Sequence, residues 1–310
     1  MWNANTVAKE IYRILEEESN GSVHSVFDRS FNLIFKDKLI HIGAAENGMA
    51  PFGIGMDQFD AQMLIRKISL GQTVMWNARS KTLHITSEDV LSLQAASVTD
   101  PFLPAIPFNR TALEKNFAYL AEKLFADEWQ TGIVQTDEEK KMILDYLMCN
   151  PSVTADHPVI KKIQQLQVFI KGQHKEALPV FDYWIGRGAG LTPSGDDILT
   201  GLCAAFAALE QDCARWTEKL ASYLKQYGSK RTTAVSVAYL TYAAKHEFHS
   251  HLIQLMESLL QPDQQQISAA LEEMKKMGHT SGTDTLIGVF AGMSTVLSGD
   301  LKKKRGEGLL

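Results

Sequence analysis

Two segments of this chain repeat one pattern of serine, glycine and aspartate whose side chains can bind a small polar ligand. Residues 194–201 and 281–288 align without a gap, and both read S-G-x-D-x-L-x-G. The matched positions pair Ser194 with Ser281, Gly195 with Gly282, Asp197 with Asp284 and Gly201 with Gly288. Hydroxyls donate and accept hydrogen bonds, and carboxyl groups can also take up or release a proton. Both segments run into apolar stretches, so we expect two similar helix starts that face one shared site.

A glycine-rich loop leads into the first segment. Gly186, Gly188 and Gly190 alternate there, so the backbone can adopt conformations that other residues avoid. Ser194 is a natural N-cap, and Asp197 stands three residues later, where the acid of a capping box stands. Amide groups exposed at such a helix start attract anions. The sequence therefore predicts an anion-binding loop that feeds a helix.

Two neighbouring carboxylates, Asp196 and Asp197, limit which ligand this helix start can take. They repel phosphate unless Arg187 or Arg231 supplies the opposing charge, or unless Mg²⁺ bridges acid and phosphate. Alternatively, they accept hydrogen bonds from an NH₂ group such as a urea or carbamoyl nitrogen. In the second copy Thr283 replaces Asp196. If only one acid caps the helix, the other is free to bind a ligand.

The elements that must position these residues change character at a proline cluster. Residues 100–107 hold three prolines and cannot form a regular helix. Before the cluster, a helix pattern over residues 4–19 gives way to short β-rich runs, with a hairpin turn predicted at residues 36–38. We therefore predict a small β-rich domain over residues 1–104, a barrel or a sandwich, with an N-terminal helix.

Beyond the cluster the sequence is helical, which makes the predicted fold class α+β. The predicted larger domain, residues 105–310, is all-α and carries the glycine-rich loop and both S-G-x-D helix starts. Its helical candidates are residues 111–129, 137–149, 157–172, 176–185, 195–210, 212–227, 232–246, 248–260, 264–277 and 282–297.

The composition limits the expected partners and compartment. The 310 residues carry a formal net charge of −5, which gives no reason to expect nucleic acid or an anionic membrane surface as partner. The three cysteines, Cys149, Cys203 and Cys213, are scattered and odd in number. That pattern favours reduced thiols over a disulfide framework. We therefore expect a cytoplasmic protein with no nucleic-acid or membrane partner.

The long motif around the first helix start resembles that of a known bacterial family. Residues 186–201 read GRGAGLTPSGDDILTG, an R-T-T segment follows at 231–233, and GHTSGTDTLIG follows at 278–288. The family includes AllH, one of three subunits of the oxamate carbamoyltransferase of anaerobic allantoin use. The resemblance implies a subunit of such an enzyme. Its reaction moves a carbamoyl group between oxalurate and phosphate, giving oxamate and carbamoyl phosphate.

The resemblance also implies partners, and its matching motif positions together with the residue chemistry above give the predicted site residues. The expected partners are a small anionic substrate (oxalurate, oxamate, carbamoyl phosphate or phosphate) and the other carbamoyltransferase subunits. The predicted catalytic residues are Asp196, Asp197, His279 and Asp284. The predicted substrate- or phosphate-binding residues are Arg187, Gly188, Gly190, Thr192, Ser194, Gly195, Arg231, Ser281 and Gly282. No cofactor follows from the motif, and Mg²⁺ held by Asp196 and Asp197 stays open.

Two other functions fit the same residues. One is a non-catalytic assembly subunit, whose glycine loop serves packing while its partners carry the active site. The other is a Mg²⁺-dependent enzyme that binds phosphate or a nucleotide. His279 precedes the second repeat and can act as an acid or base, or can serve only in the turn beside Gly278.

Overall fold

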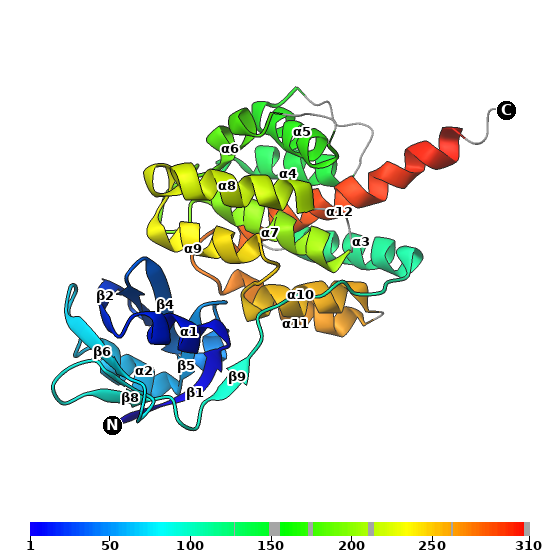
Figure 1. Ribbon diagram of the computed structural model, residues 1–310. Helices are drawn as coiled ribbons and strands as arrows, with labels where there is room; N and C mark the ends of the chain where they lie inside the picture. The colour runs from blue at the N-terminus through cyan, green and yellow to red at the C-terminus, as the bar shows by residue number, and fades with distance from the viewer. Residues whose placement is uncertain (127, 149–155, 173–175, 210–213, 262, 307–310) are drawn as a thin grey trace. The chain divides into compact units, whose positions relative to one another are not determined.

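The chain forms two compact units, which are shown in Figure 1. The computed structural model describes residues 1–126, 128–148, 156–172, 176–209, 214–261 and 263–306. The first unit comprises Met1–Phe102 with Phe248–His251, and the second comprises Leu103–Glu247 with Leu252–Leu310. The first unit is built mainly from strands and the second from helices, which confirms the predicted α+β class.

The first unit is a closed β-barrel. Its strands are β1 (Trp2–Ala8), β2 (Asn20–Val26), β3 (Ser30–Phe35), β4 (Lys38–Ala44), β5 (Gly53–Met56), β6 (Thr73–Asn77), β7 (Thr82–His84), β8 (Val90–Ser92) and β9 (Ser97–Thr99). Hydrogen bonds join them in the order β5-β4-β3-β2-β6-β7-β8-β1, and β1 also pairs with β5. Eight strands of this continuously described region therefore close into a ring. Of the two predicted alternatives, the barrel is confirmed.

β3 and β4 supply much of the barrel core. Phe31, Leu33 and Phe35 alternate along β3 and are fully buried, because successive side chains of a strand point to opposite faces. Phe35 pairs with Lys38 across a two-residue turn, and Lys36 takes a positive φ of 55° in that turn. The hairpin predicted at residues 36–38 is confirmed.

The chain begins with a strand, so the helix predicted over residues 4–19 is wrong in its first half. β1 comes first, and a shorter helix, α1 (Glu10–Glu17), follows it. β1 pairs with β5 along one edge and with β8 and β9 along the other. This pairing on both edges overrides a weak local preference for helix. α1 keeps the predicted apolar face, with Ile11, Ile14 and Leu15 buried.

The second unit is helical throughout its described elements. They are α3 (Arg110–Ala126), α4 (Asp137–Leu147), α5 (Pro158–Ile170), α6 (Leu178–Trp184), α7 (Ser194–Ala208), α8 (Ala214–Arg231), α9 (Ala234–Ala243), α10 (Ser250–Leu260), α11 (Gln264–Lys275) and α12 (Ser281–Gly306). α10 starts in the segment that belongs to the first unit. Each helix overlaps one that the apolar periodicity predicts. The barrel adds a short helix, α2 (Gln58–Ile65), and a single 3₁₀ turn, Ala45–Asn47.

α7 is the central helix of the second unit, and α12 packs against it. Every residue of α7 except Thr200 is buried. A Cβ on Gly201 would lie 1.9 Å from the carbonyl oxygen of Thr285, and one on Gly288 would lie 2.0 Å from that of Ile198. Because Gly201 aligns with Gly288 and Ile198 with Thr285, the two contacts are reciprocal. The two repeat segments therefore form a close helix crossing, in which the missing side chain of each glycine lets the backbone of the other helix approach.

Candidate functional site

The two repeat segments meet through their serine and aspartate side chains. Ser194 hydrogen bonds with Asp284, and Ser281 hydrogen bonds with Asp197. Each serine thus hydrogen bonds with the acid of the other repeat copy. Asp284 is completely buried and Asp197 is 8 % exposed. The expectation that the two helix starts lie together is confirmed, and we call these four residues the serine–aspartate cluster.

Asp284 is held by many donors. The Thr131 hydroxyl donates to its Oδ1, and the Gly132 amide donates to both carboxyl oxygens at 3.3 Å. Thr280 adds a further hydrogen bond. Burial raises the pKa of Asp284, and these donors act in the opposite direction by favouring the charged form. The arrangement holds this carboxyl group in one orientation.

Thr131 and Gly132 are site residues that the sequence did not reveal. They lie before α4, 153 and 152 positions away from the acid that they contact. A Cβ on Gly132 would lie 2.1 Å from the Ser194 Oγ atom, so the loop backbone presses directly on the cluster. No motif marks this short polar stretch, because only packing brings it to α12.

Asp197 is the less satisfied acid of the cluster. Burial raises its pKa well above the ordinary value, and the charges of Asp284 and Asp196 raise it further. Hydrogen bonds from Ser281 and Thr192 act in the opposite direction, and the hydroxyl oxygens of these two residues lie 2.7 Å apart. The buried Oδ2 atom of Asp197 has no hydrogen-bond partner among the described residues. Within the described chain this oxygen is therefore buried and unpaired.

Asp196 is not the free acid that the comparison of the two copies suggests. The Gly186 amide donates to its Oδ1 at 2.9 Å, and the Thr232 hydroxyl donates to its Oδ2. Burial raises its pKa, while Thr232, Gly186 and Ser236 act in the opposite direction. The side chain therefore ties the glycine loop to the start of α9. Of the two neighbouring acids, Asp197 has the oxygen that is unpaired in the described structure.

The predicted cap of α7 is wrong in detail. The helix begins at Ser194, and Pro193 occupies the N-cap position with an extended ψ of 143° and no side-chain cap. The hydroxyl of Ser194 bonds Asp284 in place of the helix backbone. The amides of Asp196 and Asp197 donate to the Pro193 carbonyl at 2.9 and 3.2 Å. The Gly195 amide donates to the Arg187 carbonyl at 2.8 Å, so these three amides do not form an exposed anion site.

The glycine loop packs over the start of α7. Gly186 has a φ of 78°, and a Cβ there would lie 1.8 Å from the Arg231 carbonyl oxygen. Gly188 has a φ of 115°, and a Cβ there would lie 2.7 Å from the Ser194 nitrogen. Gly190 also has a positive φ, 91°, but faces open space. At the first two positions, both conformation and close approach require glycine.

The predicted arginines and histidine lie outside the serine–aspartate cluster. The Arg187 guanidinium stacks over the Tyr183 ring at 4.4 Å from its centroid, in the exposed part of the loop. Arg231 donates to the carbonyl of Asp182 and lies 3.8 Å from its carboxylate. His279 is exposed in the turn before α12. None of the three has a hydrogen bond or ion pair with a cluster residue within the described ranges.

Helix α9 contributes two further polar groups that the sequence did not single out. Tyr239 is partly buried, and its pKa is raised by burial and by the charge of Asp197. Ser236 is 1 % exposed, and its hydroxyl favours the charged form of Asp196. With Thr232 they place a polar face toward the two neighbouring acids. Serine and tyrosine in an apolar helix carry no sequence signal of such a role.

The structure does not favour a magnesium site at Asp196 and Asp197. Both oxygens of Asp196 already accept hydrogen bonds from the protein, which leaves fewer of its lone pairs for a metal ion. The part of the chain that the structure describes contains no group of three or more His, Cys, Asp or Glu side chains that can hold a metal ion. Cys203 is a buried free thiol, whereas Cys149 and Cys213 lie outside the described residues.

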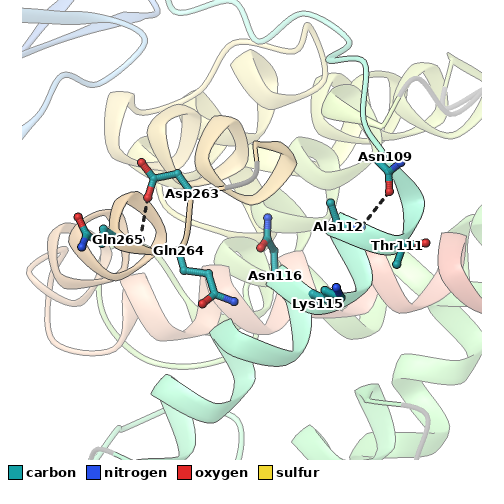
Figure 2. A pocket seen from close by; sticks show the side chains of 8 residues that line it. All are labelled: Asn109, Thr111, Ala112, Lys115, Asn116, Asp263, Gln264 and Gln265. Atoms are coloured by element: carbon teal, nitrogen blue, oxygen red, sulfur yellow. Dashed lines mark hydrogen bonds between the residues drawn. The ribbon is translucent and has the colours of Figure 1, made fainter.

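A separate groove of about 570 Å³ lies between the starts of α3 and α11, as Figure 2 shows. The side chain of Asn109 accepts from the Ala112 amide, and Asp263 caps α11 by accepting from the Gln265 amide. The groove is lined by Asn109, Thr111, Ala112, Lys115, Asn116, Asp263, Gln264 and Gln265. None of the predicted site residues lines it, so it is a feature distinct from the serine–aspartate cluster.

Comparison with known families matches both units. The model of the oxamate carbamoyltransferase subunit AllH matches residues 184–293, which include the whole serine–aspartate cluster. The model of the AllH family N-terminal domain matches residues 3–98, the barrel. The chain belongs to the AllH family. No solved structure matches it.

Membership in the AllH family places the chain among subunits of a carbamoyltransferase complex. The two matches together cover most of the chain and leave unmatched the segment from residue 99 to residue 183. That segment contains Thr131 and Gly132, which contact the cluster. Of the helices that the structure describes, none is both long and apolar enough to cross a membrane.

Proposed function

We propose that this chain is a subunit of an oxamate carbamoyltransferase and that its serine–aspartate cluster binds substrate and takes part in catalysis. The reaction proposed is transfer of a carbamoyl group between oxalurate and phosphate. The observation that carries the proposal is the assembly of two buried acids and two serines across the internal repeat, inside the region matched by the AllH model. Buried acids with raised pKa values are typical of functional sites.

The proposed chemistry uses hydroxyl and carboxyl groups. A phosphate oxygen attacks the carbamoyl carbon of oxalurate, and the bond from that carbon to the amide nitrogen breaks. Oxamate leaves after its nitrogen takes up a proton, and the carbamoyl group remains on phosphate. Donors placed at the developing oxyanion stabilise the tetrahedral intermediate. In this proposal Asp197, Ser281 and Thr192 contact the carbamoyl group, while Asp284 and Ser194 hold them in place.

The phosphate part of the substrate requires a cation. Arg187 is exposed beside the loop and can grip phosphate with two parallel hydrogen bonds. Arg231 is engaged by Asp182 and would have to leave it to do the same. We therefore assign the phosphate contact to Arg187 and a positioning role to Arg231, Gly188 and Gly190. His279 stays a predicted acid or base at the edge of the site. A cytoplasmic role in allantoin degradation completes the proposal.

The test is carbamoyl transfer from carbamoyl phosphate to oxamate, measured with the chain and its partner subunits together. Asp197→Ala and Asp284→Ala are expected to lower kcat by about 100-fold or more, the range for loss of one transition-state donor or acid–base group. Asp263→Ala removes the partly exposed cap of α11, which has no hydrogen bond with the serine–aspartate cluster among the described residues, and this matched control should retain activity. Complex assembly is checked by size-exclusion chromatography.

The alternative of a non-catalytic assembly subunit makes the opposite prediction. The glycine loop does pack against α7, which is what a purely structural loop would do. If both acid variants assemble normally and retain wild-type turnover, the cluster is structural and the active site belongs to the partner subunits. The third alternative, a Mg²⁺–nucleotide enzyme, is not favoured, because Asp196 is already satisfied by protein donors.

A further inference from the structure

One oxygen of the serine–aspartate cluster lacks the partner that its burial demands. Asp197 is 8 % exposed, and its Oδ2 atom is inaccessible to solvent and has no hydrogen-bond partner among the described residues. A buried ionised oxygen without a donor is strongly unfavourable. Its equivalent in the repeat, Asp284, has donors from Thr131 and Gly132 at its carboxyl group. The two acids occupy matching positions but have different hydrogen-bond environments.

Among the described residues, the groups that act on the pKa of Asp197 or respond to its charge include no positively charged side chain. The pKa of Asp197 is shifted by Ser281 and Asp284 from α12, by Asp196 from its own helix, and by Thr192 from the glycine loop. Tyr239 on α9 is a fifth neighbour, whose own pKa is raised by the charge of Asp197. Three of these five are themselves titratable acids. Each of two neighbouring buried carboxyl groups raises the cost of charging the other. The charge of Asp284 raises the pKa of Asp197, so this environment favours a proton on one of the two acids.

The hydrogen bonds decide which acid carries that proton. Asp284 accepts at both oxygens, and an ionised carboxylate, which has only acceptor sites, suits this environment. Asp197 keeps one oxygen without a donor, and a hydroxyl at that oxygen removes the unpaired charge.

We propose that Asp197 is a neutral carboxylic acid whose Oδ2 hydroxyl donates a hydrogen bond to the carbonyl oxygen of the ligand's carbamoyl group. The ligand contact rests on the proposed function, whereas the protonation of Asp197 does not. A neutral acid also removes the repulsion between this helix start and an anionic substrate. The site then offers donors to the carbonyl oxygen, where negative charge develops during attack by phosphate.

Infrared difference spectroscopy of the free chain tests the protonation. The wild-type spectrum minus that of Asp197→Asn at pH 7 should contain the carbonyl band of a protonated carboxylic acid, with a shift in D₂O. Asp284→Asn, the matched change in the other repeat, should keep that band. Only carboxylate bands in the first difference spectrum would overturn the proposal. Loss of the acid band in Asp284→Asn, together with its retention in Asp197→Asn, would place the proton on Asp284 and overturn it as well.

Kinetics of the reconstituted complex test the ligand contact, with carbamoyl phosphate as the probe. Asparagine is neutral and retains an N–H donor, so Asp197→Asn should change KM by less than about threefold. Asp197→Ala lacks a donor and should raise KM about tenfold, the usual effect of losing one hydrogen bond. Equal KM values in the two variants would overturn the contact. A complex without any carbamoyl transfer would refute the proposed function, and the infrared result would still decide the state of Asp197.

Discussion

At the scale of single residues, position in the hydrogen-bond network matters more than residue type. Asp196, Asp197 and Asp284 are all buried acids with raised pKa values. Asp196 and Asp284 have protein donors at both carboxyl oxygens, and Asp197 does not. We therefore propose that the first two hold the structure in place and that Asp197 acts on the ligand.

Asp197→Asn should stabilise the chain at neutral and higher pH. The pKa of Asp197 is raised in the folded state above its ordinary value of 3.8, so the folded state binds more protons than the unfolded state above that pH. Stability is then fully present at low pH and is lost as pH rises toward the folded pKa. Asparagine does not titrate. Urea unfolding at pH 4.5 and 8 should show that the variant gains on the wild type at pH 8; equal stability differences at both pH values would contradict this.

Gly132→Ala should destabilise the cluster through one contact. The added Cβ would lie 2.1 Å from the Ser194 Oγ atom. The buried hydroxyl cannot move away without losing its hydrogen bond to Asp284. Overpacking with a lost hydrogen bond costs about 1–3 kcal/mol of unfolding free energy. In a Ser194→Ala background, the atom nearest to the Cβ added at residue 132 would be the Cβ of residue 194, at 3.3 Å. The same change should therefore cost much less. Chemical denaturation of the four proteins measures the coupling, and simple additivity would refute the contact.

At the scale of elements, the repeat allows two helices to cross at close distance. Gly201 and Gly288 let the backbones of α7 and α12 approach, and the crossing brings each serine to the acid of the other copy. The site thus depends on residues two turns inside each helix. A helix that is buried nearly all round, such as α7, suits this central position.

Gly201→Ala and Gly288→Ala should destabilise the chain although alanine favours helix. The new Cβ atoms would lie 1.9 and 2.0 Å from backbone carbonyl oxygens, which cannot rotate away. The steric cost should exceed the gain in helix propensity, about 1 kcal/mol, and leave a net loss of about 1–3 kcal/mol.

Gly228→Ala, inside α8, is the control for these glycine variants. Its Cβ would meet the Val237 Cγ2 atom at 3.2 Å, the end of a side chain that can adjust. It should change the unfolding free energy little. Thermal unfolding of the three variants makes the comparison, and equal effects at all three positions would argue against a close crossing.

At the scale of the whole molecule, the two units bury titratable groups of opposite kinds and should respond to pH in opposite ways. The first unit includes Phe248–His251, which returns to it from the helical part of the chain. Phe248 and Ser250 donate backbone hydrogen bonds to Pro101 and Met49 at 2.9 Å. This segment places histidine side chains against the barrel residue Gly48, where a Cβ would lie 2.4 Å from His249. The barrel thus contains buried bases, and the helical unit contains buried acids.

Acid should destabilise the barrel unit and not the helical unit. Burial lowers the pKa of His41 to about 4, and burial with the charges of His251 and His41 lowers that of His249 to about 3. Below the ordinary value of 6.5 the unfolded state binds more protons, so barrel stability falls as pH decreases from about 6.5 toward 4. The raised pKa values of Asp197 and Asp284 act oppositely in the helical unit.

Hydrogen exchange of the two units at pH 4.5 and 7.5 measures this contrast. Protection of β3 and β4 should fall at the lower pH, and His249→Gln should reduce that fall. Protection of α7 should hold or rise at the lower pH. Parallel changes in both units would show that these side chains do not control the pH response. The predicted domain boundary at residues 104 and 105 stays a prediction for which separate expression of the two parts is the test.

Local patterns were sufficient for most elements. The apolar periodicity predicts α3 to α12, and the turn at residues 36–38 predicts the β3–β4 hairpin. They fail at β1, where hydrogen bonds to three other strands decide the conformation. They also fail at the start of α7, since Ser194 bonds a distant acid and Pro193 takes the cap position.

The sequence by itself determined the α+β class, most of the helical elements, the internal repeat and the family. These features depend on residues close together in the chain, or on a motif that survives as a string. Only the tertiary structure decided that the repeat crosses at its glycines, that Thr131 and Gly132 hold Asp284, and that Asp197 keeps an unpaired oxygen. Hydrogen bonds that span about 150 residues arise from packing, and no local pattern of residues specifies them.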